Sequence, residues 1–131
     1  LALNSSQAIN LESHLSIISD TNLDVISRAS AIQQLAYTTP NITLKVLAPY
    51  LSNNEPLIRL GAASAAMLLP ETDKISLLIP LLTDRYKAIR VAAALSLVGS
   101  KIPAEHQSIF IKAFKETISK LSMLLLLPFL V

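Results

Sequence analysis

The sequence predicts an all-α protein made of repeated helix pairs, with about seven helices in total. Of its 131 residues, 52% are hydrophobic and 15% are charged, a composition typical of a folded domain rather than of a disordered chain. Three arginines, Arg28, Arg59 and Arg90, follow one another at a constant spacing, which we call the repeat period, and the segments around them align without a gap. Apolar residues in these segments recur at helical spacing, with no competing strand pattern. A fixed period in the range of about 20–50 residues is typical of solenoid repeats.

A single helix precedes the complete repeats. It carries one apolar stripe at helical spacing, formed by Ala8, Leu11, Leu15 and Ile18. One repeat unit cannot bury its apolar face alone, so neighbouring units must stack against one another. We therefore expect one domain over residues 1–120, with a half repeat at 6–19 and repeats at 22–52, 53–83 and 84–116.

Each complete repeat contains signals for two helices. A polar residue precedes the first helix as its expected cap (Asn22, Asn54 and Asp84). A proline opens the second helix, where its missing N–H would have no partner within the helix. These prolines are Pro40, Pro70 and Pro103. The expected helix pairs are 23–38 with 41–52, 55–69 with 71–83, and 85–99 with 103–120.

Small residues and two internal prolines indicate how the helices pack and bend. Gly61 aligns with Ser30 and Ala92 in the neighbouring repeats, so we expect a neighbouring helix backbone to approach closely at this register. Pro49 and Pro80 fall well inside second helices and should kink them. The third repeat has Ile111 at the equivalent position, so its second helix should be straighter and longer.

The C-terminal end, residues 121–131, is an uncharged apolar run interrupted by Pro128. A membrane span needs about 20 apolar residues, so this run is too short to cross a bilayer. We expect a tail separate from the repeats that packs over the last helix or into a neighbouring chain. A truncated membrane anchor and a non-native end are the alternatives.

Taken together, these features resemble the HEAT-repeat family in its short bacterial form. The shared features are helix pairs that recur at this period, an Arg in the first helix, a proline entering the second, and a closing Leu-Leu followed by Asn or Asp. The resemblance implies a right-handed α–α superhelix whose second helices line a concave surface. The segment is also similar to HEAT-like stretches beside multihaem c-type cytochrome and tetratricopeptide modules in larger bacterial exported proteins. No CxxCH motif occurs here, so no haem can be assigned to any residue.

Few side chains point to catalysis. The chain has no Cys and only two histidines, His14 and His106, which lie near opposite ends of the chain, and this makes a shared metal site improbable. Glu71 and Asp73 begin a helix, where acidic residues complement the positive end of the helix dipole. We therefore expect no enzymatic activity, no cofactor and no metal.

The repeated arginines are expected to have a structural role that ties one repeat to the next. Arg90 has no acidic residue four positions before it, so it should reach Asp84 or a carbonyl of the adjoining turn. The other two have such a residue at the spacing at which helix neighbours pair: Asp24 before Arg28 and Glu55 before Arg59.

Charge is distributed unevenly along the chain. Residues 1–73 have three basic and six acidic side chains, net −3, whereas residues 74–131 have eight basic and three acidic, net +5. The basic half could be a solvated surface, or it could dock an acidic partner or a neighbouring domain. The candidate partner-binding residues, on the second helices and adjoining turns, are Lys45, Tyr50, Lys74, Arg85, Tyr86, Lys87 and Lys112.

These features favour a non-catalytic protein-interaction scaffold, a module of a larger bacterial protein that binds a partner or neighbouring domain through its concave face. The alternative is an accessory domain of a multihaem cytochrome-type redox protein or of a lyase. The small net charge of +2 disfavours nucleic acid, and membrane contact through the tail is less favoured than protein contact. The location would be periplasmic if the cytochrome-associated resemblance holds and cytoplasmic otherwise.

Overall fold

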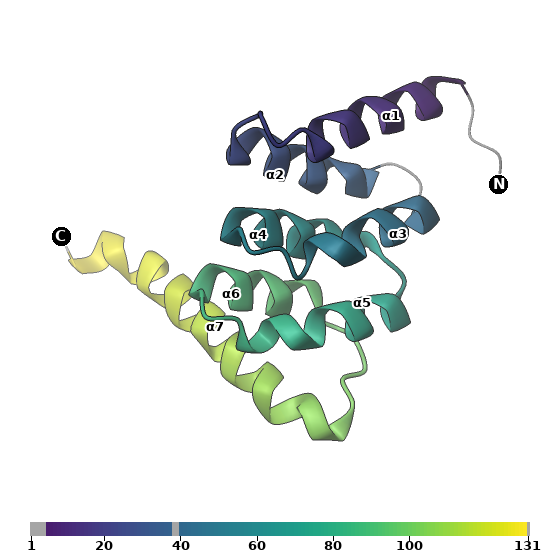
Figure 1. Cartoon of the computed structure of the whole chain (residues 1–131). Coiled ribbons are helices and arrows are strands. Elements are labelled where there is room, and N and C mark those ends of the chain that lie inside the picture. Colours follow the sequence, from purple (N-terminus) through teal and green to yellow (C-terminus); the bar gives the residue numbers. More distant parts are fainter. Residues whose placement is uncertain (1–4, 38–39, 131) are drawn as a thin grey trace.

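The computed structural model describes residues 5–37 and 40–130, and within them the side chains of residues 11–37 and 45–119. The described residues form seven α-helices, joined by turns and short 3₁₀ segments, and contain no strand (Figure 1). This confirms the predicted all-α class and helix number. The helices are α1 Ser5–Ser19, α2 Val25–Gln34, α3 Pro40–Tyr50, α4 Pro56–Ala65, α5 Glu71–Leu78, α6 Lys87–Ser96 and α7 Gln107–Leu130.

The helices stack in layers, as Figure 1 shows, with α3 and α4 between α1 and α2 on one side and α5 and α6 on the other. Packing along the stack runs through the first helix of each repeat, which is α2, α4 or α6. Helix α2 packs against α1 and α4, α4 packs against α6, and α6 packs against α7. Helices α3 and α5 pack against the first helices of the next pair and against the neighbouring turns. The column of first helices therefore contains the main contacts between units.

The core repeats with the same period as the sequence. Leu35 and Leu97 are fully buried at the ends of two first helices, two repeat periods apart. Buried positions in successive units are separated by one repeat period, so each stacked pair contributes the same face to one continuous core. Further sets of buried equivalents are Ala31, Ala62 and Ala93; Ile32, Ala63 and Ala94; and Leu51, Leu82 and Ala113.

Small residues bring the first helices unusually close together. A Cβ atom added at Gly61 in α4 would lie 2.6 Å from the backbone oxygen of Ala29 in α2. Between α6 and α4, the buried Ser96 hydroxyl donates a hydrogen bond of 3.1 Å to the Ala63 carbonyl. The close helix approach predicted from Gly61 is confirmed, and it explains why this mid-helix position has no side chain.

The first helices begin slightly later than predicted. The N-cap of α2 is Asp24, whose carboxylate accepts hydrogen bonds from the Ser27 backbone N–H at 2.8 Å and hydroxyl at 2.7 Å. These hydrogen bonds lower the pKa of the Asp24 carboxyl below its ordinary value. The caps of α4 and α6 are Glu55 and Tyr86, and neither makes a side-chain capping bond.

The predicted caps, Asn22, Asn54 and Asp84, were therefore wrong, because a short turn precedes each cap. In the turn before α4, the Asn53 side-chain oxygen accepts a hydrogen bond of 2.9 Å from the backbone N–H of Glu55, and Asp84 accepts one of 3.0 Å from Tyr86. Asn and Asp commonly bond to the backbone two residues onward in this way. Such a turn resembles a cap in sequence but places the helix start further along the chain.

The prolines at the starts of second helices lie where predicted. Pro40 is the first residue of α3, Pro70 is the N-cap of α5, and Pro103 precedes the 3₁₀ segment Ala104–His106 that runs into α7. The internal prolines behave differently from the prediction, since neither lies well inside an α-helix. Pro49 is the penultimate residue of α3, and Pro80 is the second residue of the 3₁₀ segment Ile79–Thr83 that follows α5.

The first helices are also shorter than expected. Helix α2 passes into the 3₁₀ segment Leu35–Tyr37, and α4 passes into the 3₁₀ segment Ala66–Leu68. Tightening of the last turn into 3₁₀ geometry is common at helix ends. The predicted end of the second helix of the chain, at residue 38, lies outside the described residues.

Helix α7 corrects the predicted boundary between the repeats and a separate tail. It is a single helix of 24 residues that ends at Leu130, so residues 121–130 continue the helix instead of folding back over it. A longer helix was predicted here because Ile111 stands where the other second helices have proline, and the length of α7 agrees with that prediction. Figure 1 shows its C-terminal part extending past α6 and away from the stack.

Substitution of Gly61 by Ala should destabilise the protein although Ala is the better helix former. The new Cβ would clash with a backbone atom that cannot move without separating α2 from α4. We expect the free energy of unfolding to fall by about 1–2 kcal/mol, as for other overpacked cores, measured by urea unfolding. The control Ser30→Ala changes the exposed equivalent position in α2 and should alter stability by less than about 0.5 kcal/mol. Equal stability of the Gly61 variant and the wild type would contradict the close-packing explanation.

Candidate functional site

The repeated arginines connect neighbouring units of the stack. The guanidinium of Arg59 in α4 donates to both carboxylate oxygens of Asp84, at 2.8 Å and 3.2 Å. It also donates a hydrogen bond of 2.7 Å to the backbone oxygen of Asn53. The two charged side chains are only 12% and 8% exposed. This bidentate pair therefore joins the second repeat to the start of the third in a largely dry environment.

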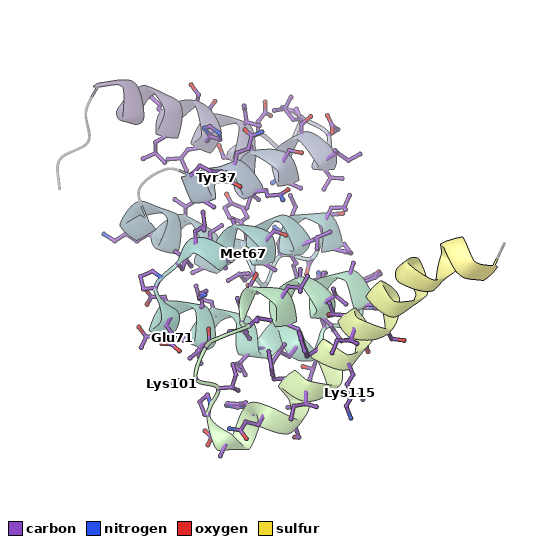
Figure 2. The ribbon with its side chains drawn as sticks, turned by 180° about the vertical axis from the view of Figure 1, so that it is seen from behind. Tyr37, Met67, Glu71, Lys101 and Lys115 are labelled. Atoms are coloured by element: carbon purple, nitrogen blue, oxygen red, sulfur yellow. The ribbon has the colours of Figure 1, made fainter. Side chains whose placement is uncertain are left out.

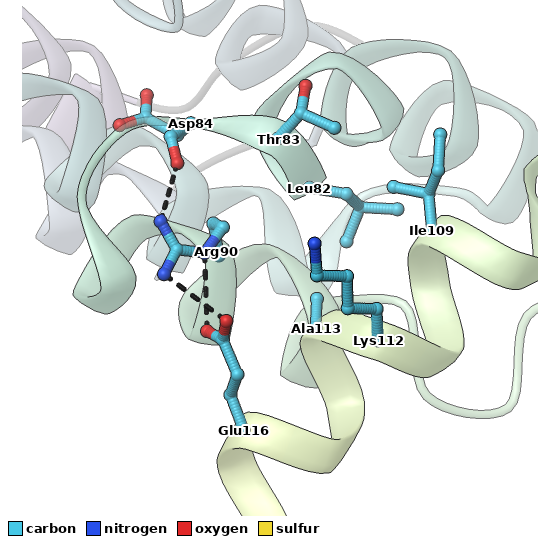
Figure 3. A pocket seen from close by; sticks show the side chains of 8 residues that line it. All are labelled: Leu82, Thr83, Asp84, Arg90, Ile109, Lys112, Ala113 and Glu116. Atoms are coloured by element: carbon cyan, nitrogen blue, oxygen red, sulfur yellow. Dashed lines mark hydrogen bonds and ion pairs between the residues drawn. The ribbon is translucent and has the colours of Figure 1, made fainter.

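Arg90 makes the corresponding contacts one repeat later. Its guanidinium donates to both carboxylate oxygens of Glu116 in α7, each at 3.2 Å, and to the backbone oxygen of Asp84 at 2.8 Å (Figure 3). In the first repeat, Arg28 donates to the backbone oxygen of Ile18 in α1 at 2.9 Å. Arg28 and Arg59 thus contact an adjacent unit, whereas Arg90 joins α6 to α7 and to the turn before α6 within the third repeat.

The within-helix pairs expected from the sequence do not form among the described residues. Asp24 caps α2 through Ser27 and does not pair with Arg28. Arg59 turns away from Glu55, toward an acid 25 residues later. Asn53 occupies the position equivalent to Asp84 one repeat earlier, which leaves Arg28 without a corresponding acidic partner there. The useful signal was thus an acid 25 or 26 residues after an arginine rather than one helical turn before it.

Asp84 is the centre of this network. Burial by itself would raise the pKa of its carboxyl. Hydrogen bonds from the Arg59 guanidinium and the Tyr86 backbone N–H, together with the positive charges of Arg59 and Arg90, outweigh that effect and lower the pKa below its ordinary value. Asp84 is consequently ionised at neutral pH and links two arginines and the start of α6.

A groove of about 410 Å³ adjoins this network between the end of the α5 unit and α7 (Figure 3). Most of its charged residues are already paired with one another, as Arg90 is with Glu116. Lys112 also lines the groove and is in no ion pair with a described residue. The groove is lined by Leu82, Thr83, Asp84, Arg90, Ile109, Lys112, Ala113 and Glu116.

The other candidate partner-binding residues are spread over several elements. Lys45 and Tyr50 lie on α3, Lys74 lies on α5, and Lys87 begins α6. In the turn before α6 the structure brings two candidates together. The Arg85 guanidinium carbon lies 5.2 Å from the centre of the Tyr86 ring, and that of Arg59 lies 5.9 Å from it. Two guanidinium groups therefore lie near the Tyr86 ring.

Sequence reasoning missed the most exposed apolar residues at the turns between the first and second helices. We call these four residues, Tyr37, Met67, Leu68 and Val98, the turn row. They are 83%, 48%, 53% and 52% exposed, respectively. Figure 2 shows Tyr37 and Met67 on successive turns at one edge of the stack, with Glu71 and Lys101 further along that edge. The sequence did contain a signal for these residues, because apolar residues recur at the turns: one repeat period separates Met67 from Val98 and also Tyr37 from Leu68.

Lys101 joins two units at the same edge. Its backbone N–H donates a hydrogen bond of 2.5 Å to a carboxylate oxygen of Glu71. Glu71 and Asp73 lie in the first turn of α5, as the sequence predicted. The Glu71 carboxylate thus also fixes the turn that leads toward α7, and it makes this edge of the second and third units a continuous surface.

The histidines and acidic residues do not form a metal site within the part of the chain that the structure describes. No group of three or more His, Asp or Glu side chains there could hold a metal ion. The ring of His14 lies 3.3 Å from the Gln34 side-chain oxygen, and His106 lies 3.8 Å from Glu105 beside it. Among the described residues, no helix combines the length and apolar character needed to span a membrane.

Comparisons with protein-family models, curated proteins and solved structures found no match to this chain.

Removal of the Arg59 side chain should destabilise the stack strongly. Arg59→Ala leaves the Asp84 carboxylate largely buried without its partner, and the cost of breaking such a pair is about 3 kcal/mol. We expect a clear decrease in the midpoint of thermal unfolding. Lys45→Ala removes an exposed cation of similar length from α3 and should leave the midpoint nearly unchanged. Equal decreases for the two variants would show that the arginine contacts do not hold the units together.

The stability of the protein should depend on the ionisation of Asp84. Because its pKa is lower in the folded protein than in the unfolded chain, its contribution is present above the unfolded value of about 3.9 and is lost as the pH falls through the folded value. Asp84→Asn should therefore be less stable at neutral pH but lose less stability on acidification. Urea unfolding at a series of pH values between neutral and acidic measures this difference. Parallel pH profiles of variant and wild type would contradict the role of Asp84.

Proposed function

We propose that the protein is a right-handed α–α superhelix of the HEAT type that acts as a non-catalytic protein-binding scaffold within a larger bacterial protein. Support comes from the buried positions that recur once in every repeat period and from Arg28 and Arg59, which connect successive units. In stacked repeats such contacts between neighbours supply much of the stability. The result is a rigid support for an extended binding surface.

The turn row is the observation on which the proposal depends. Its four side chains expose apolar area at equivalent positions of successive units. Contiguous exposed apolar residues with a polar border commonly mark protein-binding surfaces. Tyr37 supplies the large aromatic side chain that is typical of interface hot spots.

The neighbouring second helices add positive charge to this surface. Lys45 on α3 is exposed and Lys74 on α5 is half-buried, and neither forms an ion pair with a described residue. The partner that fits best is therefore a protein segment with apolar side chains for the turn row and acidic side chains for the lysines. Complementary charge of this kind contributes mainly to specificity and to the rate of association.

The charged side chains with the best hydrogen-bond geometry have a structural role. Arg59 pairs with Asp84 across two units, and Arg90 binds Glu116 and the backbone oxygen of Asp84 within the third. An active site needs polar groups that are held in place yet available to a substrate. Their mutual pairing supports a structural role for this cluster and a binding role for the exposed edge.

Disruption of the turn row should abolish partner binding without unfolding the protein. The tagged chain is cross-linked in an extract of the source cells, and captured proteins are quantified for the wild type and for the double variant Met67→Ser/Leu68→Ser. We expect the specific partner to be lost by about tenfold or more, since truncated apolar hot spots have effects of this size. Thermal unfolding should change little, because both side chains are about half exposed.

The matched control is the double variant Ile26→Ser/Leu57→Ser. It removes two exposed apolar side chains from the first helices α2 and α4 and leaves the turn row intact. The same partner should be captured as by the wild type. If both double variants lose the partner equally, or if neither loses it, the turn row is not the binding surface.

A further inference from the structure

The C-terminal part of α7 leaves the rest of the fold. The helix packs against α6, and its Ala113 and Thr117 are buried. Residues 121–130 continue the same helix for about 15 Å, at 1.5 Å per residue. Figure 1 shows this part extending past the end of α6 with no other described helix beside it. We call residues 121–130 the arm.

The arm has a strongly apolar sequence. It reads LSMLLLLPFL and contains no charged residue. Leucines occupy four consecutive positions, 124–127. A helix that is apolar on all sides is normally buried in protein or in lipid. A segment of this composition is therefore expected to be covered by protein or lipid, and Figure 1 shows no other described helix beside it.

The part of α7 that leads to the arm has a basic and apolar outer surface. Ile111 and Ile118 are 48% and 46% exposed, and Lys115 lies between them at helical spacing on the same side of the helix. Lys112 and Lys115 are exposed and form no ion pair with a described residue. Glu116, the one acidic residue of α7, is held by Arg90. Figure 2 shows Lys115 on α7, on the side of the molecule away from the turn row.

We infer that α7 binds the surface of an anionic lipid bilayer, with the arm inserted among the acyl chains and the lysines near the headgroups. Apolar residues beside Lys are typical of helices that bind membrane interfaces. The arm is about half as long as the hydrocarbon core of about 30 Å is thick, so these residues fit within one leaflet. Lysine side chains can extend along apolar surface and keep the ammonium group at the headgroups.

The charges on α7 favour a lipid surface over a second copy of the chain as the surface that contacts the arm. A parallel pair of α7 helices would bring the lysines of both copies together, and the only acidic residue of the helix is already paired within its own chain. Anionic headgroups instead attract basic residues near the membrane surface. The inference is independent of the proposed partner surface, because the turn row and α7 are distinct parts of the molecule.

Vesicle binding of the full chain tests this inference. Co-sedimentation is measured with vesicles of phosphatidylcholine alone and with vesicles that also contain phosphatidylserine. The wild type should bind the anionic vesicles at least about tenfold more strongly. The arm variant Leu125→Asp/Phe129→Asp and the lysine variant Lys112→Glu/Lys115→Glu should each lose that binding. Thermal unfolding of both should remain close to the wild type, since the changes lie in the arm and on exposed positions.

The matched control is Lys45→Glu/Lys74→Glu, which makes the same change of charge on α3 and α5 and should retain vesicle binding. Loss of vesicle binding in this control as well would overturn the inference, because the attraction to anionic vesicles would then depend on the total charge of the protein and not on the lysines of α7. The size of the protein in solution is measured without vesicles. A dimeric wild type that does not bind vesicles, together with a monomeric arm variant, would identify a second copy as the cover and would also overturn it. The capture experiment with the turn row is unaffected by either result.

Discussion

The bidentate pair between Arg59 and Asp84 is the constraint on which the stack depends most. It joins side chains that are distant in sequence, at the point where the second repeat meets the third. Asp84 also directs the chain into α6 through the Tyr86 N–H and accepts Arg90 on its backbone oxygen. A buried ion pair does not by itself guarantee net stabilisation, but removal of one partner is costly. The pair therefore makes the relative position of the two units hard to change.

Close packing of the first helices reinforces the same arrangement. The missing side chain at Gly61 lets α4 lie against the backbone of α2, and the Ser96 hydroxyl bonds to α4 from α6. Small residues give each helix little room to rotate, because interiors are packed near crystal density. The arginine contacts at the turns and the tight contacts along the helices thus act on the same interfaces. Together they leave the turns and the outer sides of the helices free for other roles.

The turn row and the arm are two separate features of the molecule. The turn row lies where the first helices end, and the arm lies at the end of α7. They differ in chemistry, since Tyr37 and Met67 sit on a packed edge whereas the arm is a helix without a neighbour. These differences separate a protein-binding edge from a segment suited to lipid. One rigid stack can present both, because neither uses residues of the arginine network.

The sequence by itself determined the helices. Apolar spacing, prolines at helix starts and the glycine at Gly61 are local signals, so the all-α class, the number of helices and the close approach of α2 and α4 could be predicted. Only the tertiary structure decided which acid each arginine meets, which apolar side chains stay exposed, and where α7 extends. The partners Arg59 and Asp84 lie on different units, and their distance depends on how the units stack. Local pattern favoured the nearer acids, whereas stacking brought the distant ones into reach.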